Sequence, residues 1–213
     1  MLEYVKYAGL ILVAYLVGSI PMGLLVVRAV SGVDVRTVGS GRTGGTNAFR
    51  AGGVLAGILT GVGDLLKGFI AVSLPLWLFG DRPFLLALCG IAAVAGHNWS
   101  VFIGFRGGAG TGTNVGAAVA IWPLVGLWLV PLVPALLVVT GYASVTSTVT
   151  CAVLLIGFLI RAAVGGAPWE YAAYSAVTLI LVALALLPNY RRLLEGTERM
   201  VGPRARRLGK NPR

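Results

Sequence analysis

Charged residues are scarce in this sequence. Asp, Glu, Lys and Arg make up 11% of its 213 residues, against about 25% in an ordinary soluble domain. Hydrophobic residues make up 57%, and the mean hydropathy is +0.89. A water-soluble chain of this length has too little interior to hide so much apolar surface, and a disordered chain would contain far less of it. Soluble enzymes and disordered proteins are therefore excluded.

Metal-binding and redox residues are also few. The chain has one histidine, His97, and two cysteines, Cys89 and Cys151, both inside apolar runs. Such cysteines are typical of small buried hydrophobic residues, and a zinc site would need more ligands close together. The sequence contains neither a G-x-S-x-G elbow nor a Ser-His-Asp order. We expect no metal and no cofactor, and a serine hydrolase has little support.

The net charge of +10 is unusual for so apolar a chain. A nucleic-acid binder can be this basic, but it would not be hydrocarbon over most of its length, so we expect no nucleic-acid partner. Basic residues between apolar spans are typical of the cytoplasmic face of a polytopic membrane protein. The basic tail, from about residue 189, is expected to lie near anionic lipid headgroups.

A helix needs roughly 20 apolar residues to cross a bilayer. Five runs meet this length approximately: 7–27, 54–79, 84–102, 144–160 and 171–187. The stretch 113–139 is either one long helix or two shorter ones separated near Trp122 and Pro123, because proline lacks an amide hydrogen and disfavours helix before it.

The distribution of basic residues chooses between six helices and seven. With six, the basic residues divide ten against six. With seven, thirteen fall on one face (four in the first loop, Arg106 and eight in the tail), three fall on the other, and Lys67 lies within a span. The second division obeys the positive-inside rule far better. We therefore predict an all-α, polytopic integral membrane protein, a single domain over residues 1–213. It has seven transmembrane helices, with its N-terminus outside and its C-terminus cytoplasmic.

Two predicted cytoplasmic loops have the composition of anion-binding sites. The first, residues 34–50, combines glycines with hydroxyl groups and with Arg42 and Arg50, which suits phosphate; a flexible loop whose arginines only set the topology fits its composition equally well. The second includes Arg106 and a glycine run ending at Gly110, just before a helix too short to cross a bilayer. Free amides at that helix start favour an anion, and a tilted helix with packing glycines is the alternative.

Three ionisable residues remain open to two interpretations. His97 is either a general base or phosphate ligand, or a structural hydrogen-bonding group. Asp64 and Lys67 share one face of the second predicted span. Ionisable residues within a span are candidates for function by default, and a structural ion pair is equally plausible here.

Five motifs, in one order along nearly the whole chain, resemble the bacterial acyl-phosphate-dependent glycerol-3-phosphate acyltransferases of the PlsY type. They are Gly18-Ser-Ile-Pro21 with Val38-Gly-Ser-Gly, Gly44, Thr46-Asn47 and Arg50; Asp64-x-x-Lys67-Gly68; Gly96-His97 with Gly107-Gly108-x-Gly110; Tyr142-x-Ser144-x-x-Ser147; and Asn189-x-x-Arg192-Leu-Leu-x-Gly196-x-Glu198.

The resemblance implies a seven-helix enzyme of the bacterial inner membrane whose active site faces the cytoplasm. The 1-hydroxyl of glycerol 3-phosphate would attack a fatty acyl phosphate, giving lysophosphatidate and phosphate; both substrates and membrane lipids are the expected partners. The implied catalytic residues are Ser40, Arg50, Arg106 and Asn189. The implied substrate-binding residues are Gly39, Gly41, Arg42, Thr46, Asn47, His97, Gly107, Gly108, Gly110, Ser144, Ser147, Arg192 and Glu198.

The chain departs from the pattern of that family at three places. Ala109 stands where the family usually has the lysine of a Gly-Gly-Lys-Gly loop, and Leu186 and Leu187 replace a usual His-Arg pair. Arg42 stands where asparagine is usual. We hypothesise that Arg42 restores the positive charge lost at Ala109. A membrane binder or transporter of a phosphorylated solute is the alternative function; internal repeats, which would favour a transporter, are not found.

Overall fold

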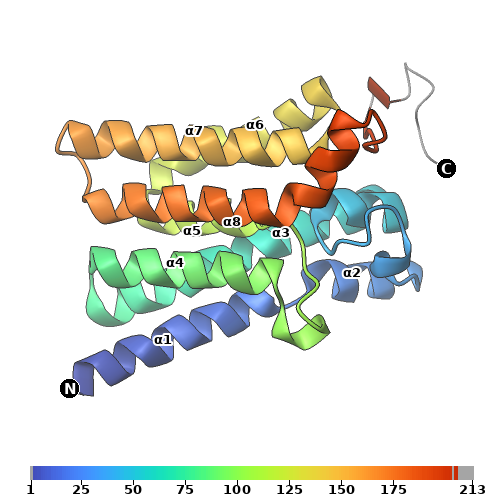
Figure 1. Ribbon diagram of the computed structural model, residues 1–213. Helices are drawn as coiled ribbons and strands as arrows, with labels where there is room; N and C mark the ends of the chain where they lie inside the picture. The colour runs from blue at the N-terminus through green and yellow to red at the C-terminus, as the bar shows by residue number, and fades with distance from the viewer. Residues whose placement is uncertain (1, 203, 206–213) are drawn as a thin grey trace.

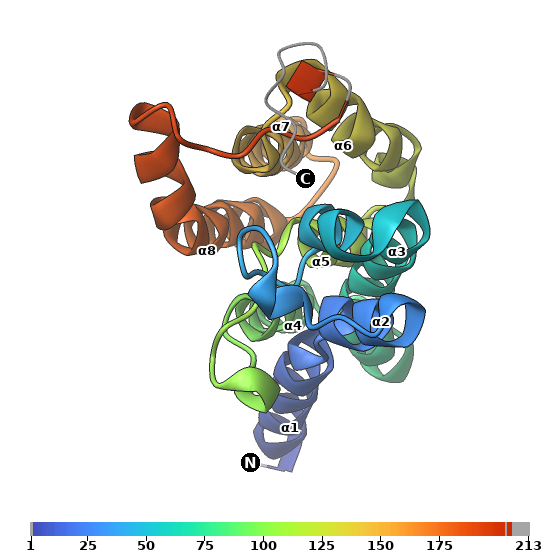
Figure 2. The same cartoon turned by 90° about the vertical axis from the view of Figure 1, so that its right-hand side faces the viewer.

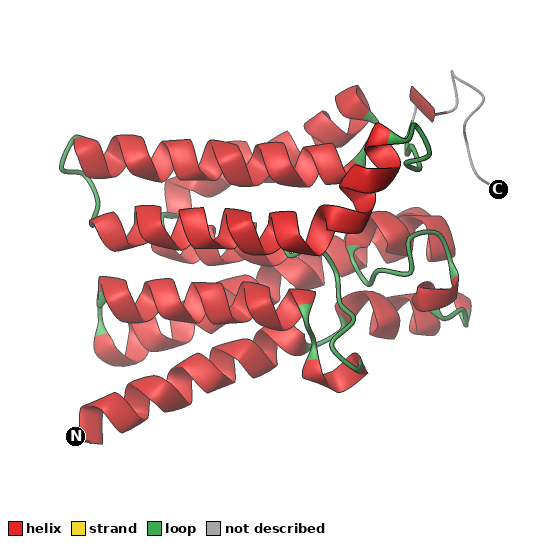
Figure 3. Cartoon of the chain, in the orientation of Figure 1, coloured by secondary structure: helices red, strands yellow, loops and turns green. Residues whose placement is uncertain are grey.

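The computed structural model describes residues 2–202, 204 and 205, and this part of the chain consists of helices joined by loops, without strands (Figure 3). Three short 3-10 turns, η1 (Val35–Thr37), η2 (Val101–Ile103) and η3 (Pro123–Val125), connect some of the α-helices. The α-helices are α1 (Leu2–Ser19), α2 (Met22–Ser31), α3 (Gly45–Phe79), α4 (Pro83–Asn98), α5 (Thr111–Ile121), α6 (Gly126–Thr140), α7 (Ala143–Ala163) and α8 (Trp169–Leu194).

Six stretches of the described residues are long and apolar enough to cross a membrane: 3–31, 45–79, 83–103, 123–140, 143–163 and 169–194. The sequence predicted seven, and the difference lies at α5. The split of 113–139 is confirmed, because α5 ends at Ile121 and η3 begins at Pro123. However, α5 has 11 residues, which at 1.5 Å per residue is well short of a bilayer core of about 30 Å. The prediction of seven spanning helices is wrong at this helix.

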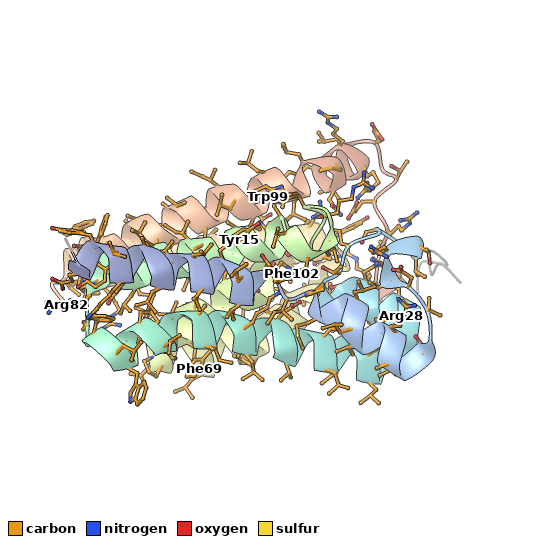
Figure 4. All side chains as sticks on the ribbon, turned by 90° about the horizontal axis from the view of Figure 1, so that it is seen from below. Tyr15, Arg28, Phe69, Arg82, Trp99 and Phe102 are labelled. Atoms are coloured by element: carbon orange, nitrogen blue, oxygen red, sulfur yellow. The ribbon has the colours of Figure 1, made fainter. Side chains whose placement is uncertain are left out.

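The long helices lie along a shared axis (Figure 1). In that view α1 begins at the left-hand end and α8 ends at the right-hand end, while the short α5 lies within the bundle. Arg82, before α4, and Arg28, on α2, lie at opposite ends of the molecule (Figure 4). The polar loops after α2 and after α8 therefore share one end of the bundle.

A break inside α3 shapes that end. Gly53 has a φ of +78° and a ψ of −167°, a conformation that side-chain-bearing residues rarely adopt. The chain folds back there, so that residues 45–52 lie beside the next turns of the same helix. A Cβ on Gly57 would come 2.8 Å from the Cβ of Phe49, and one on Gly45 would lie 3.5 Å from the Cα of Gly61. This fold-back at Gly53 places the end of the first loop beside the start of the long apolar half of α3.

Glycines let the other helices approach closely. A Cβ on Gly18 of α1 would overlap the backbone of Ala93 in α4, and one on Gly68 of α3 would overlap the backbone of Thr113 in α5. Helices in membranes pack through such small residues because the hydrophobic effect does not drive them together there. The Tyr15 hydroxyl donates a hydrogen bond to the carbonyl of Trp99 at 2.8 Å, and the two residues are neighbours in Figure 4. This bond holds the second loop against α1.

Candidate active site

A cavity of about 520 Å³ opens among the first loop, α3, the start of α5, α6, the start of α7 and the end of α8. Figure 2 looks onto the end of the molecule where the loop after α2 and the chain after α8 lie. The cavity has two chemically different regions. Its polar region contains Ser40, Arg42, Thr46, Asn47, Arg50, Asn189, Arg192, Glu198 and Arg199, and its apolar region contains Ile58, Val62, Val130, Val133, Pro134 and Leu137.

Arg42 connects three parts of the polar region. One guanidinium nitrogen donates to the carbonyl of Gly108 at 3.0 Å, and the other donates to the carbonyl of Ala185 in α8. Burial, together with the nearby charge of Arg192, lowers the pKa of the Arg42 guanidinium. The ordinary pKa of arginine is so high that the group still carries its charge at neutral pH. A cation is therefore held beside Ala109, which also lines the cavity.

Asn47 shapes the first loop from within. Its side-chain nitrogen lies 2.9 Å from the carbonyl oxygens of Val35, Val38 and Arg42, and its side-chain oxygen accepts from the amide of Ser40 at 3.1 Å. These contacts occupy most of the hydrogen-bonding capacity of the amide. Asn47 borders the cavity, but its contacts are those of a residue that fixes the loop.

Gly39 and Gly41 have φ values of +57° and +70° and do not line the cavity. The Cα of Gly39 lies so close to Asn47 that a Cβ there would collide with the side-chain oxygen of Asn47. These two glycines thus set the path of the loop, which carries Ser40 and Arg42 to the cavity.

Glu198 organises the end of α8. Its carboxylate accepts from the Asn189 side-chain amide at 2.7 Å and from Nε of Arg192 at 3.1 Å. The Glu198 side chain is 5% exposed, so this ion pair is shielded on the carboxylate side. Both Asn189 and Arg192 are thereby held at the cavity wall.

The chain after Glu198 closes the polar region on one side. Arg50 donates to the carbonyl of Arg199 at 3.1 Å, and Arg199 donates to the carbonyl of Gly39. Farther on, the amide of Val201 donates to the carbonyl of Gly141 at 2.8 Å. The segment therefore links the first loop to the turn between α6 and α7.

A buried charged cluster lies at the cavity wall, where Asp64 and His97 are among the lining residues. Oδ1 of Asp64 is 3.1 Å from Nζ of Lys67 and 3.4 Å from Nδ1 of His97, and the three side chains are at most 5% exposed. Lys67 also donates to the carbonyl of Ile20 at 2.9 Å, and the carbonyl of His97 accepts from the amide of Gly108 at 3.1 Å. The cluster joins α3, α4, the break between α1 and α2, and the second loop.

The structure gathers most of the sequence-predicted site residues but not all of them. Arg106 is exposed and does not line the cavity; neither do Gly107 and Gly108, which bond to the end of α4, nor the buried Ser144. The predicted residues that line the cavity are Ser40, Arg42, Thr46, Asn47, Arg50, His97, Gly110, Ser147, Asn189, Arg192 and Glu198.

Four polar lining residues were not among the predicted site residues: Asp64, whose role the sequence left open, and Thr111, Thr146 and Arg199, which were missed. Thr111 follows the glycine run at the start of α5, and Thr146 and Arg199 each adjoin a motif residue, so proximity to a motif was the available signal. Among the described residues, no group of three or more His, Cys, Asp or Glu side chains is placed to hold a metal ion.

Comparison with known proteins identifies the family. The family described as glycerol-3-phosphate acyltransferase matches residues 8–196. A glycerol-3-phosphate acyltransferase of Rubrobacter xylanophilus is 42% identical over 92% of this chain and 96% of its own. Glycerol-3-phosphate acyltransferase 2 of Moorella thermoacetica is 39% identical over 92% and 97%.

Solved structures agree with these relatives. The glycerol 3-phosphate form of PlsY (YgiH), an integral membrane glycerol 3-phosphate acyltransferase, superposes with a TM-score of 0.83 at 33% identity, covering 95% of this chain and 98% of that one. The lysophosphatidic acid form of PlsY gives 0.81 at 34% identity, covering 92% and 96%. Over nearly its whole length the chain is thus similar, in sequence and in its all-helical fold, to proteins of one activity, and it belongs to the glycerol-3-phosphate acyltransferase family.

Proposed function

We propose that this protein transfers a fatty acyl group from acyl phosphate to the 1-hydroxyl of glycerol 3-phosphate. The observation that carries this proposal is the division of one cavity into an arginine-rich region and an apolar region. Acyl phosphate has a charged head and a hydrocarbon tail, and glycerol 3-phosphate adds a second phosphate. Arginine is well suited to phosphate because its planar fork donates two parallel hydrogen bonds.

The two phosphates need two binding places close together. We assign Ser40, Thr46, Arg42 and Arg50 to one of them. The amides at the start of α5, beside Gly110, suit the other, because Gly110 makes no side-chain cap there and the first amides of a helix lack partners within it. Arg106, which was predicted to hold this second phosphate, has no part in the assignment, because it is exposed and does not line the cavity. Asn189, Ser147 and Arg192 then face the glycerol phosphate.

The chemical step requires no covalent enzyme intermediate. The 1-hydroxyl oxygen attacks the acyl carbonyl carbon, the bond from that carbon to the phosphate oxygen breaks, and the leaving phosphate takes the hydroxyl proton. Acyl phosphate is already activated, so orientation of the two substrates and stabilisation of negative charge supply the catalysis. The fixed positions of Arg42, Asn189 and Arg192, each tied to a neighbouring element, suit that task.

We further propose that the cavity faces the cytoplasm of a bacterial cell and that the protein resides in the inner membrane. The polar loops share the end of the bundle at which α8 finishes (Figure 1), and basic loops are retained on the cytoplasmic side. Fusing a reporter enzyme that works only in the periplasm to the C-terminus tests this orientation. Activity of that reporter would refute it.

Purified protein in lipid vesicles, given acyl phosphate and labelled glycerol 3-phosphate, tests the reaction. We expect labelled lysophosphatidate and one equivalent of inorganic phosphate. Acyl-CoA and acyl-carrier protein, offered separately, test the choice of donor and are expected to give no product. Accumulation of unmodified glycerol 3-phosphate inside the vesicles, without lysophosphatidate, would favour a transporter instead.

A further inference from the structure

Gly61 lies at the point where the two regions of the cavity meet. It belongs to the cavity-facing side of α3, which also presents Gly57, Ile58 and Val62. Gly45, at the end of the polar first loop, packs beside the backbone of Gly61. A Cβ added at Gly61 would meet no atom within 4 Å. The space that a side chain at position 61 would occupy is therefore open cavity. Close helix packing does not require a glycine there.

The apolar region of the cavity reaches the lipid-facing surface between α3 and α6. Both helices line the cavity, yet α6 packs against α5 and α7 and scarcely touches α3. Cavity-lining residues of both helices are also well exposed: Ile58 by 58%, Val62 by 50% and Val130 by 45%. Such a gap, bordered by apolar side chains, joins the cavity to the hydrocarbon of the membrane.

We propose that Gly61 is a specificity-determining position in this opening, where the absent side chain leaves room for the first part of the acyl chain. This inference rests on the proposed function. The rest of the acyl chain passes between α3 and α6 into the bilayer, so the protein does not select donors by the total length of the acyl chain. A larger side chain at position 61 obstructs long acyl chains, which must pass through the opening. It does not obstruct acyl chains short enough to end before the opening.

The test compares Gly61→Ala, Gly61→Leu and Gly61→Phe with the wild type, using butanoyl phosphate and hexadecanoyl phosphate as donors. The ratio of kcat/KM for the long donor to that for the short donor is expected to stay near the wild-type value in Gly61→Ala. It is expected to fall at least about tenfold in Gly61→Phe, since size discrimination in an apolar pocket typically reaches that range. Gly61→Leu is expected to lie between them.

Gly9 on α1 provides a matched control. It is exposed, and a Cβ there would also meet no atom within 4 Å, so Gly9→Phe adds the same side chain at a distant lipid-facing position. Its donor ratio is expected to equal that of the wild type. Equal losses for both donors in Gly61→Phe, or an unchanged ratio, would overturn the inference.

A labelling experiment probes position 61 without measuring the activity of a variant with a bulky side chain. Gly61→Cys in membranes is expected to react with a lipid-soluble maleimide, and long-chain lysophosphatidate, but not glycerol 3-phosphate, is expected to slow the reaction. The wild type, whose Cys89 and Cys151 are buried, gives the background. Labelling that lysophosphatidate leaves unchanged would argue against the opening. A wild type that makes no lysophosphatidate from either donor would instead overturn the proposed function, and this inference with it.

Discussion

The guanidinium of Arg42 donates a 3.0 Å hydrogen bond to the carbonyl of Gly108, the residue before Ala109. The sequence led to the hypothesis that Arg42 supplies the positive charge of the lysine that related proteins usually carry at position 109. This hydrogen bond joins Arg42 and Gly108, which are 66 positions apart in the sequence, and Arg42 and Ala109 line the same cavity. Charge lost from one loop can thus be supplied by the other.

Replacement of Arg42 tests that exchange. Arg42→Ala is expected to lower kcat/KM about ten- to a hundredfold, because hydrogen bonds to a charged group contribute roughly 1.5–3 kcal/mol. The double variant Arg42→Ala, Ala109→Lys is expected to recover a large part of the activity. Initial rates of lysophosphatidate formation by the purified variants measure both effects.

Arg28 supplies the control for the loss of one arginine. It is exposed on α2, away from the cavity, and Arg28→Ala is expected to keep wild-type rates. Full activity in Arg42→Ala would show that the compensation does not exist, and a double variant no better than Arg42→Ala would place the lysine and arginine in different roles.

The buried pair of Asp64 and Lys67 gives a prediction about stability. Lys67→Met leaves the Asp64 carboxylate without its partner at 3.1 Å, and breaking a buried pair in this way costs roughly 3–5 kcal/mol. The double variant Asp64→Asn, Lys67→Met removes both charges and is expected to be more stable than Lys67→Met alone. Thermal unfolding in one detergent ranks the three proteins. A Lys67→Met protein that melts with the wild type would show that the pair does not stabilise the fold.

The sequence predicts most of this fold because long apolar runs have few alternatives in a membrane. The helical character, the break at Trp122 and Pro123 and the long apolar half of α3 follow from composition and proline placement. The shortness of the helix after Gly110 was predicted, and α5 confirms it. The helix was nevertheless counted among seven spans, since the count of basic residues reports on which side a loop lies and not on helix length. The fold-back at Gly53 was not foreseen, because a glycine in an apolar run does not reveal a positive φ.

The sequence predicted which types of residue gather at the site, but it predicted less well which contacts these residues make. Glycines, hydroxyl groups and arginines in the first loop indicated an anion site, and several of them line the cavity. Whether an arginine side chain points into the cavity depends on its contacts with residues distant in the sequence. For this reason Arg106 was included among the predicted site residues and Arg199 was not. Asn47 was assigned to the substrate, and its amide instead contacts three carbonyls of its own loop.

Glu198 is expected to act by placing Asn189 and Arg192. Glu198→Ala frees both side chains, so we expect KM for glycerol 3-phosphate to rise about fivefold, the size of an effect near 1 kcal/mol, with a smaller change in kcat. Glu198→Gln can still accept from Asn189 and should lie between. Glu195→Ala, an exposed position three residues earlier, is the control. A fall in kcat with KM unchanged would contradict this positioning role.

Gly18 and Gly9, on the same helix, separate close packing from helix propensity. A Cβ at Gly18 would overlap the backbone of Ala93, whereas one at Gly9 would meet nothing within 4 Å. Gly18→Ala is therefore expected to force α1 and α4 apart and lower the unfolding temperature. Gly9→Ala should leave the unfolding temperature unchanged or raise it slightly, because alanine favours a helix over glycine by roughly 1 kcal/mol. Scanning calorimetry or fluorescence of the detergent-solubilised proteins measures the difference. Equal unfolding temperatures for the two variants would mean that α1 does not rest on α4 at Gly18.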